Sequence, residues 1–395
     1  NGLAITVDPE ISPSYHVEEW ADNGSGSMGL YVLSANVILQ DVSISGYNNC
    51  GANLQVDSTS ESNLFIDGLT IDNVGRKGLY LVGYEGSINN LSITNISDLD
   101  DLRFTEPDPE TAEVTDNLDF CGLIDQNIGA GIIFANVDLS NVNIEDVQGY
   151  GITMYQSNSV IDTISTTGAT CAGPMAFQSS LTINNGEWLG YNATYDVLGS
   201  SLVGYQSTLL QVNNSSFQGV GEDFFGTSVY AYDGDNFFFE GNTFTDSSIG
   251  IYTNDASLAL TNNTFQNQIS YSLYLLYGET RNHSLTDNIF QSEAALDTSA
   301  IQCYSGGNIE MNGDYFFDIY GSYAMTTSGC NVEMEDVSFE NIGSYALYGY
   351  GGDFELDSIS FTNTGLETGY SQALYFYASA AMNISVLNTT FESTS

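Results

Sequence analysis

The side chains that could do acid–base chemistry in this sequence are almost all carboxylates. The chain carries 50 Asp and Glu residues but only two histidines, His16 and His283, which lie in unrelated contexts. Two carboxyl groups that flank a glycosidic bond can hydrolyse it, and Asp100 and Asp101 form the only adjacent Asp pair. Because chance pairs are frequent among so many carboxylates, the pattern assigns no catalytic residue. No Gly-x-Ser-x-Gly motif supports a serine nucleophile either.

Carboxylates are also oxygen ligands of the kind that calcium prefers. Two clusters could supply them, Asp98 with Asp100 and Asp101, and Asp233 with Asp235. The chain contains neither an EF-hand loop nor a nonapeptide calcium repeat. We therefore expect solvated acidic loops with no bound metal and no cofactor, and calcium binding is the alternative.

The charge balance limits the partners of the protein. Only four basic residues, Arg76, Lys77, Arg103 and Arg281, oppose the 50 acidic ones, so the formal net charge is -46. Nucleic acids and anionic membranes are poor partners for such a chain. Self-repulsion is tolerable where salt or divalent cations screen it, so we expect an extracellular or cell-surface protein in a saline environment. Alternatively, the acidity only keeps an exposed surface soluble.

The cysteines predict one disulfide and no zinc site. They are Cys50, Cys121, Cys171, Cys303 and Cys330, and none forms a CxxC pair. Since the number is odd, at least one thiol lacks a partner within the chain. Cys303 and Cys330 fall on adjacent coils of the repeat described below, so we expect these two to pair.

Ten Asn-x-Ser/Thr sequons are candidates for glycosylation, which would agree with a secreted protein. They begin at Asn23, Asn90, Asn95, Asn192, Asn213, Asn214, Asn262, Asn282, Asn383 and Asn388. Four of them, Asn90, Asn214, Asn262 and Asn388, are also the turn residues of the repeat, where a β-branched residue naturally follows. Those four matches therefore have a structural explanation as well.

The elements that would position all these residues are short strands in one repeated unit. Each unit has two strands with period-two alternation and ends in a large apolar anchor. The anchors are Ile44, Ile71, Ile93, Ile144, Ile164, Trp188, Phe217, Phe244, Phe265, Phe290, Phe316, Phe339, Phe361 and Phe391. A unit of this kind, repeated along the whole chain, indicates a stacked parallel coil. We expect about fourteen coils.

A tight corner precedes twelve of the fourteen anchors by three residues. The position holds Asp41, Gly68, Asn90, Asn141, Asn185, Asn214, Gly241, Asn262, Asp287, Gly313, Asp336 and Asn388. Gly, Asn and Asp tolerate the left-handed conformation, so we expect the same turn on every coil, with asparagines that hydrogen-bond from coil to coil. We expect all five prolines to lie outside the regular coils, because proline removes a strand donor.

The domain organisation follows from this repeat. We expect residues 1–28 to form an N-terminal cap and residues 29–395 to form the β-helix, with 98–128 as an acidic loop insertion. The sequence stops within the coil pattern, which predicts an open edge that another copy could extend end to end. We expect no transmembrane segment because no apolar run approaches the ~18 residues that a span requires.

Tyrosines form the most regular feature of the expected outer surface. One outward strand position holds Tyr31, Tyr80, Tyr230, Tyr252, Tyr274, Tyr348 and Tyr375, and the next holds Tyr232, Tyr304, Tyr350 and Tyr377. Such a stripe suits stacking on sugars or packing against another rod. Tyrosine also favours strands and stabilises neighbouring ones, which is the competing explanation.

The repeat resembles the parallel β-helix repeats of the pectin-lyase-like superfamily over residues 29–391. The resemblance implies an all-β right-handed parallel β-helix, and it implies two chemistries to test. A lyase would need a basic catalytic residue, for which Arg76, Lys77 and Arg103 are the candidates, but a polyanionic substrate would be repelled. The polygalacturonase-like motifs Asn-Thr-Asp, Gly-His-Gly and Arg-Ile-Lys are absent.

The hypothesis that we favour is a non-enzymatic extracellular β-helix that serves as a surface-layer, fibre or adhesin module. It would associate with itself or with other surface proteins, and glycans are further candidate partners. One alternative is a carbohydrate-binding protein or a carbohydrate-active enzyme for a neutral polysaccharide. Another is a tailspike-like trimer, whose copies would contact side by side.

Overall fold

The computed structural model describes most of the chain. The described residues are 3–6, 28–34, 36–56, 62–97, 127–169, 172–191, 200–219, 226–276, 281–292, 299–320, 323–365, 372–377 and 382–393. Every regular element within them is a β-strand, and the strands pair in parallel. No helix among these residues is long and apolar enough to cross a membrane.

The chain divides into two compact units. Unit 1 comprises Asn1–Met175 with Asn192–Gly199, and unit 2 comprises Ala176–Tyr191 with Ser200–Ser395. The strands of unit 1 are β1 (Leu3–Thr6), β2 (Met28–Leu33), β3 (Asn36–Ser45), β4 (Cys50–Gln55), β5 (Asn63–Val74), β6 (Lys77–Val82), β7 (Glu85–Ile96), β8 (Asn127–Ile133), β9 (Asn136–Val147), β10 (Gly149–Tyr155) and β11 (Asn158–Thr167). Short and long strands alternate, and each pairs with its counterpart one coil away, as β4 does with β2 and β6.

Unit 2 also consists of parallel strands, and their lengths vary from three to 14 residues. Strand β12 (Ala172–Phe177) runs across the boundary in the sequence. The rest are β13 (Ser180–Tyr191), β14 (Ser200–Tyr205), β15 (Leu209–Asn213), β16 (Ser216–Gly219), β17 (Thr227–Glu240), β18 (Thr243–Thr245), β19 (Ile249–Thr261), β20 (Thr264–Gln266), β21 (Tyr271–Leu276), β22 (Asn282–Thr286), β23 (Ile289–Ser292), β24 (Ser299–Tyr304), β25 (Asn308–Asn312), β26 (Tyr315–Ile319), β27 (Tyr323–Ser328), β28 (Asn331–Glu335), β29 (Ser338–Ile342), β30 (Leu347–Tyr350), β31 (Phe354–Asp357), β32 (Ser360–Thr364), β33 (Leu374–Tyr377), β34 (Ile384–Leu387) and β35 (Thr390–Glu392).

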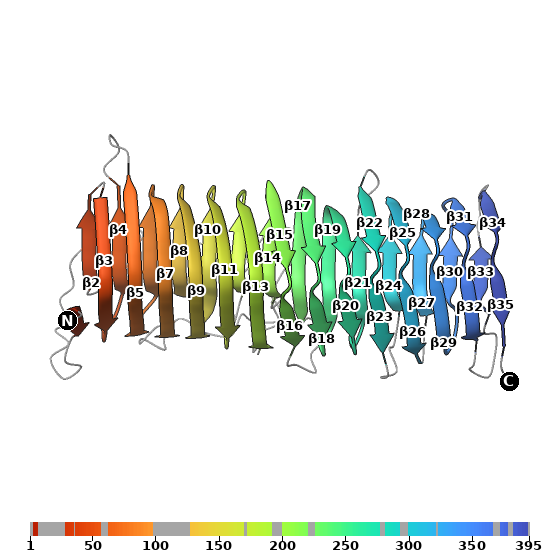
Figure 1. Cartoon of the computed structure of the whole chain (residues 1–395), viewed down its shortest axis with the longest axis horizontal. Helices are drawn as coiled ribbons and strands as arrows, with labels where there is room; N and C mark the ends of the chain where they lie inside the picture. The colour runs from red at the N-terminus through yellow and green to blue at the C-terminus, as the bar shows by residue number, and fades with distance from the viewer. Residues whose placement is uncertain are drawn as a thin grey trace, which may run out of the picture. The chain divides into compact units, whose positions relative to one another are not determined.

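Within unit 2 the strands stack side by side in three parallel rows (Figure 1). The row used below runs through β22, β25, β28, β31 and β34. The row before it in each coil contains β21, β24, β27, β30 and β33. Because pairing is in register, the same outward position recurs on every neighbouring coil, and side chains form columns across the strands.

The predicted anchors form one aromatic stack inside unit 2. The rings of Trp188, Phe217, Phe244, Phe265, Phe290, Phe316, Phe339, Phe361 and Phe391 follow one another with centroids 4.2 to 5.1 Å apart. All except Phe391 are buried. Aromatic pairs of this kind add stability beyond the area that they bury.

The predicted corners are confirmed. All twelve positions have φ between 48° and 75°, from Asn388 to Gly68. In unit 2 the interior hydrogen bonds between coils come from the residue one place later. Asn242, Asn263 and Asn288 each donate from Nδ2 to the next coil, at 3.0, 3.0 and 2.8 Å, and the last acceptor is Asp314 Oδ1. All four side chains of this amide ladder are buried.

The prediction of an all-β, right-handed parallel β-helix is confirmed, but the solenoid has about 12 turns and not about fourteen. Residues 7–27 of the expected cap and residues 98–126 of the expected insertion lie outside the described residues. From the first segment, β1 pairs with β3.

Candidate binding groove

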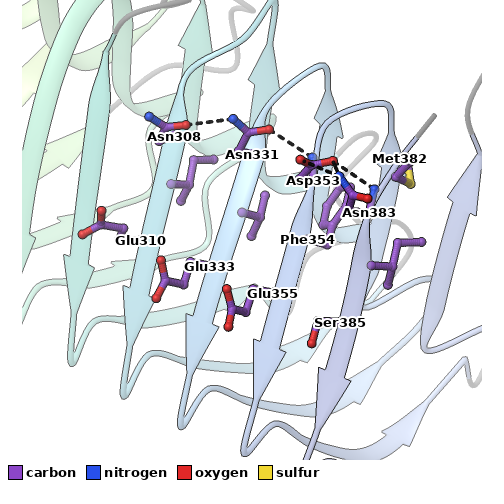
Figure 2. A pocket seen from close by; sticks show the side chains of 13 residues that line it. Asn308, Glu310, Asn331, Glu333, Asp353, Phe354, Glu355, Met382, Asn383 and Ser385 are labelled. Carbon is purple, nitrogen blue, oxygen red and sulfur yellow. Dashed lines mark hydrogen bonds between the residues drawn. The ribbon is translucent and has the colours of Figure 1, made fainter. Parts of the chain in front are cut away.

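An open groove of about 650 Å³ lies over β25, β28, β31 and β34 of unit 2 (Figure 2). Its lining comes from Asn308, Ile309, Glu310, Asn331, Val332, Glu333, Asp353, Phe354, Glu355, Met382, Asn383, Ile384 and Ser385. The polar members fall into two rows that run across the strands. These two rows line the groove, whereas no tyrosine lines it.

The first row consists of three glutamates. Glu310 pairs in register with Glu333, and Glu333 with Glu355. The three point outward because the residues between them on each strand, such as Ile309 and Met311, are buried in the core. Adjacent strands lie ~4.8 Å apart, and like charges that face each other at this spacing destabilise a sheet. A ligand that hydrogen-bonds to these carboxylates would offset that repulsion.

The second row consists of amides and one carboxylate. Asn331 Nδ2 donates to Asn308 Oδ1 at 2.9 Å, and the backbone N–H of Asp353 donates to Asn331 Oδ1 at 3.0 Å. Asn383 donates from its backbone N–H to Asp353 Oδ1 at 2.9 Å, and its side-chain amide bonds both carboxylate oxygens at 3.1 Å. The backbone N–H and the amide of Asn383 together lower the pKa of Asp353 below its ordinary value. Asp353 therefore stays ionised and acts as an acceptor, not as a general acid.

The groove suits a ligand rich in hydroxyl groups. Carboxylates accept hydrogen bonds, and amides both donate and accept them, which is the complement of a polyol. Among the described residues, no group of three or more His, Cys, Asp or Glu side chains is arranged to hold a metal ion. The calcium alternative at Asp98, Asp100 and Asp101 lies outside the described residues.

The second cluster that was expected to bind calcium, Asp233 with Asp235, forms ion pairs with Arg281. Arg281 donates from Nε to Asp255 Oδ1 at 2.8 Å, from one terminal nitrogen to Asp233 at 3.4 Å, and from the other to Asp235. Gln206 donates to the second oxygen of Asp233 at 3.0 Å. The hydrogen bonds and charges of Asp255 and Asp235 raise the pKa of Arg281, against the smaller effect of its burial. This ion cluster joins three coils of unit 2.

The tyrosine stripe is divided in unit 2. Tyr252 stacks between Tyr230 and Tyr274, with centroids 5.1 and 5.3 Å away, and Tyr348 stacks on Tyr375 at 5.1 Å. Gln302 and Thr326 occupy the two register positions between these groups and interrupt the column.

Stacking also determines which parts of the tyrosine rings a ligand can contact. A ring whose face covers its neighbour presents an edge and a hydroxyl to solvent, so these columns stabilise the coils in the way that the competing explanation expects. Tyr230 is only 5% exposed, and burial raises its pKa. At the next position Tyr350 and Tyr377 are 41% and 55% exposed and stack at 5.7 Å. Tyr350 precedes Asp353 of the groove by three residues.

In unit 1 the two tyrosines of the predicted stripe, Tyr31 and Tyr80, differ in their exposure to solvent. Tyr31 is 42% exposed. Tyr80 is half-buried, and the Lys77 ammonium lies 4.7 Å from its ring centroid. Burial raises the pKa of Tyr80.

The sequon asparagines lie mostly on the surface. Asn90, Asn95, Asn214, Asn262, Asn282, Asn383 and Asn388 are exposed and Asn213 is half-buried, whereas Asn23 and Asn192 lie outside the described residues. Several amides already donate to a neighbouring coil, for example Asn90 to Asp67 at 2.7 Å and Asn388 to Asp357 at 2.8 Å.

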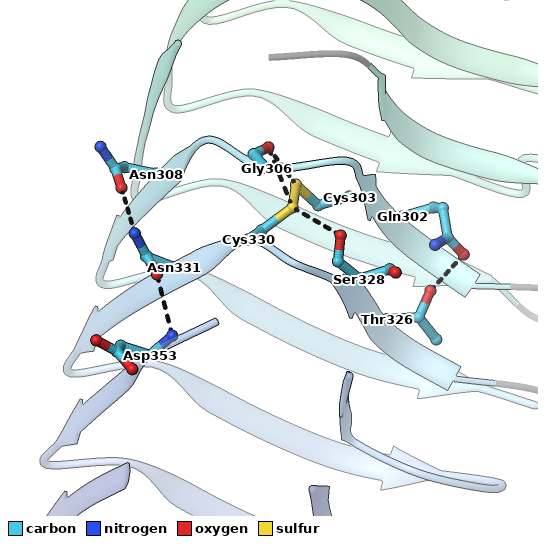
Figure 3. The surroundings of a disulfide bond; sticks show 9 residues. All are labelled: Gln302, Cys303, Gly306, Asn308, Thr326, Ser328, Cys330, Asn331 and Asp353. Atoms are coloured by element: carbon cyan, nitrogen blue, oxygen red, sulfur yellow. Dashed lines mark hydrogen bonds between the residues drawn. A yellow bond between two sulfur atoms is a disulfide. The ribbon is translucent and has the colours of Figure 1, made fainter. Parts of the chain in front are cut away.

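Cys303 and Cys330 form a disulfide between adjacent coils (Figure 3). Their sulfur atoms are 1.97 Å apart and their Cα atoms 6.4 Å apart. Cys50 is a free, buried thiol, and burial raises its pKa to about 12. Cys121 and Cys171 lie outside the described residues. The disulfide lies close to the amide row of the groove, since Asn308 and Asn331 follow the two cysteines on the same coils (Figure 3).

Sequence reasoning missed the groove although a signal was present. The segments Asn308–Met311 and Asn331–Met334 read Asn-Ile-Glu-Met and Asn-Val-Glu-Met, and the next coil has Asp-Phe-Glu-Leu. Identical outward residues at one offset predict polar columns, as the tyrosines did.

Comparison with known proteins agrees with the fold. Residues 129–293 match the family model described as the right handed beta helix region. No curated protein matches the chain. The structure is a right-handed parallel β-helix, and the match over residues 129–293 agrees with it.

Solved structures with a similar fold have different functions. The catalytic unit of a thermostable GH87 alpha-1,3-glucanase from Streptomyces thermodiastaticus strain HF3-3 is 11% identical, with a TM-score of 0.34, and the match covers 92% of this chain and 63% of that one. The surface protein and adhesin PfbA of Streptococcus pneumoniae is 12% identical, with a TM-score of 0.26, over 91% of each chain. Likenesses this weak concern the fold alone.

Proposed function

We propose that this chain is a non-enzymatic extracellular surface protein, an adhesin-like β-helix that binds neutral, hydroxyl-rich glycans in the groove over β25, β28, β31 and β34. The observation that carries the proposal is the pair of polar rows in that groove. The row of Glu310, Glu333 and Glu355 and the row of Asn308, Asn331, Asp353 and Asn383 follow four stacked strands. A linear sugar chain along the coil axis would meet the same groups at each step.

Three further features support this proposal. The net charge of -46 disfavours polyanionic glycans, so the ligand is a neutral one. The disulfide of Cys303 and Cys330 fits an oxidising compartment outside the cytosol. The aromatic stack and the amide ladder hold the strands of unit 2 in fixed register, which preorganises the groove and reduces the entropy cost of binding.

A glycan array tests the proposal directly. Wild-type protein should bind neutral oligosaccharides and not polyuronates. Glu333→Gln should weaken binding about tenfold, because hydrogen bonds to a charged acceptor are stronger than those to an amide. Glu240→Gln is the matched control, since Glu240 is also exposed on a strand of unit 2 but lies outside the groove. Binding that both variants lose equally, or an array without signal, would contradict the proposal.

Retaining glycoside hydrolysis is the second candidate, because Glu333 and Glu355 face each other on neighbouring strands ~4.8 Å apart. Retaining enzymes need two carboxyl groups about 5–5.5 Å apart. Incubation of the bound oligosaccharide with wild-type protein decides between the two. Release of reducing ends that Glu333→Gln abolishes without loss of binding would make the protein an enzyme.

Self-association, calcium dependence and a trimeric tailspike-like assembly remain predictions from the sequence. Electron microscopy at natural salt and after chelation of divalent cations tests the first two. Filaments that disappear on chelation would support both, and isolated particles under both conditions would contradict both. Native mass spectrometry would detect a trimer.

A further inference from the structure

Phe134 of unit 1 combines two features that are unfavourable for a phenylalanine. It lies in the turn between β8 and β9 (Figure 1), with φ at 50° and 56% of its surface exposed. A left-handed backbone is strained for a bulky residue, and an exposed ring gains nothing from burial. Strain of this kind is found mainly where a residue serves a function.

The same turn position in other coils shows what the backbone prefers. It holds Gly83 and Gln156 in unit 1, and Gln178, Gln206 and Asp233 in unit 2, all with positive φ. Glycine, amide and carboxylate side chains suit an exposed turn in this conformation. Phe134 is the aromatic exception among these positions, so its ring is not required by the turn.

The surroundings of Phe134 form a small apolar surface with a polar rim. The Tyr155 ring, 38% exposed, meets the Phe134 ring edge to face with centroids 5.5 Å apart. Half-buried Ile133 lies beside Tyr155 in register, and half-buried Val82 lies beside Ile133 on its other side. Two residues after Phe134, Asn136 accepts a hydrogen bond from Asn158 at 2.8 Å.

Gly83 occupies the turn position one coil away, so no side chain stands beside the Phe134 ring there. Further along, Glu85 pairs in register with Asn136 and is exposed. The apolar surface is thus open on the Gly83 side, and acceptor and donor groups border it.

We infer that Phe134 and Tyr155 form a second glycan contact, in which the apolar face of a neutral pyranose packs on the Phe134 ring and its hydroxyl groups bond to Asn136 and Asn158. A single ring with an amide rim matches one sugar unit and is far smaller than the ~800 Å² that a stable protein partner buries on each side. Because the contact is with glycan, this inference rests on the proposed function.

The test uses the full chain and one substitution with two opposite effects. Phe134→Asn places a residue that tolerates the left-handed conformation, so it should raise the melting temperature by about 1–3 °C. It removes the ring, so calorimetric titration with the neutral oligosaccharide that gives the strongest array signal should show a second site, separate from the Glu333-dependent one, that is weakened by about tenfold. Gln156→Asn, at the same turn position of the next coil, should leave binding unchanged.

The outcomes separate the inference from the proposed function. Higher stability with weaker binding would support the inference. A lower melting temperature would make Phe134 a packing residue, and unchanged binding would remove it from the contact, so either result overturns the inference. If Glu333→Gln still weakens binding in that case, the proposed function stands. If wild-type protein binds no neutral oligosaccharide, both fall.

Discussion

Asp314 accepts two hydrogen bonds of 2.8 Å from Asn288, one from its backbone N–H and one from its side-chain amide. It thereby ends the buried amide ladder, and Val337 occupies the corresponding place on the next coil. In the ladder, the Asn288 amide also donates to the Leu260 carbonyl at 3.1 Å. By register, the equivalent carbonyl for residue 314 is that of Leu285. A carboxylate oxygen would face it unfavourably, whereas a protonated carboxyl could donate to it.

The substitution Asp314→Asn should stabilise the protein at alkaline pH. Burial raises the pKa of Asp314 to about 7, so the folded chain holds a proton that the unfolded chain releases above its ordinary pKa of 3.8. Stability from this group is therefore complete below pH 3.8 and is lost as the pH rises to about 7, a change on the order of 4 kcal/mol. An asparagine fits the ladder at every pH. Urea unfolding of both proteins at pH 4 and pH 8 measures the difference.

The two proteins should be about equally stable at pH 4, and the variant should unfold at higher urea at pH 8. The charge of Asp287 raises the pKa of Asp314 further, so Asp287→Asn serves as a control that should reduce the difference without removing it. A variant that is less stable than wild type at pH 8 would mean that residue 314 needs its charge.

His283 should lower the stability of the folded protein as the pH falls, which is the opposite of the effect of Asp314. Its side chain faces the core of unit 2, where its register partner is Ile309, and it is 3% exposed. Burial, with a smaller effect from Arg281, lowers its pKa to about 4 from 6.5. The unfolded chain binds the proton first as the pH falls below 6.5, so stability is lost between pH 6.5 and 4, on the order of 3 kcal/mol.

His283→Leu should therefore remove that loss. The variant should be more stable than wild type at pH 4.5 and differ less at pH 8, and the measurement is again urea unfolding. The double variant with Asp314→Asn should have the flattest pH profile. If His283→Leu unfolds more readily at pH 4.5, the imidazole makes a hydrogen bond that outweighs its burial.

The solenoid could be predicted from the sequence because the residues that specify it recur at fixed, short spacings. A corner residue such as Asn262 and an anchor such as Phe265 recur at fixed offsets, and each has one physical explanation. The aromatic stack followed directly, since anchors at one offset must lie above one another in parallel coils. The tyrosine columns were recognised for the same reason, although stacking turns their faces away from a ligand.

The glutamate and amide rows of the groove recur at one offset in the sequence, but the hollow that they line and the strained turn depend on information that is not periodic. Asp314 lies one residue after the corner Gly313, where other coils have asparagine. The consequence of a carboxyl group in place of an amide there cannot be predicted without knowing which groups the side chain faces. Phe134 occupies a turn position whose other residues vary, so no consensus marked it as left-handed. Whether a row of outward glutamates lies in a hollow depends on the shape of neighbouring turns, which composition does not determine.

Arg281 should be a principal stabiliser of the coils around β17, β19 and β22. It is 15% exposed and bonds Asp233, Asp235 and Asp255, whose mutual repulsion it neutralises. Arg281→Gln should lower the free energy of unfolding by about 2 kcal/mol, because three carboxylates lose their counter-ion while remaining partly solvated. Arg281→Lys, which keeps the charge without the planar fork, should lose about half as much. Added salt should narrow the gap between Arg281→Gln and wild type, and a gap that salt leaves unchanged would point to packing instead of charge.

Substitutions of Phe265 should measure how much the aromatic stack contributes to the stability of unit 2. Its buried ring lies 4.6 Å from Phe244 and 5.1 Å from Phe290, both nearly parallel to it. Phe265→Ala should lower the free energy of unfolding by about 3–5 kcal/mol, since it loses apolar contacts and leaves a cavity between two rings. Phe265→Leu fills most of the space and should cost about 1–2 kcal/mol, of which the lost ring stacking is a part. Among the described residues the exposed Tyr377 stacks on Tyr350 alone, so Tyr377→Ala is the control and should cost less than 1 kcal/mol. Hydrogen exchange of the β20 and β23 amides would locate the effect, and equal exchange in Phe265→Ala and wild type would show that the stack contributes little to holding these coils together.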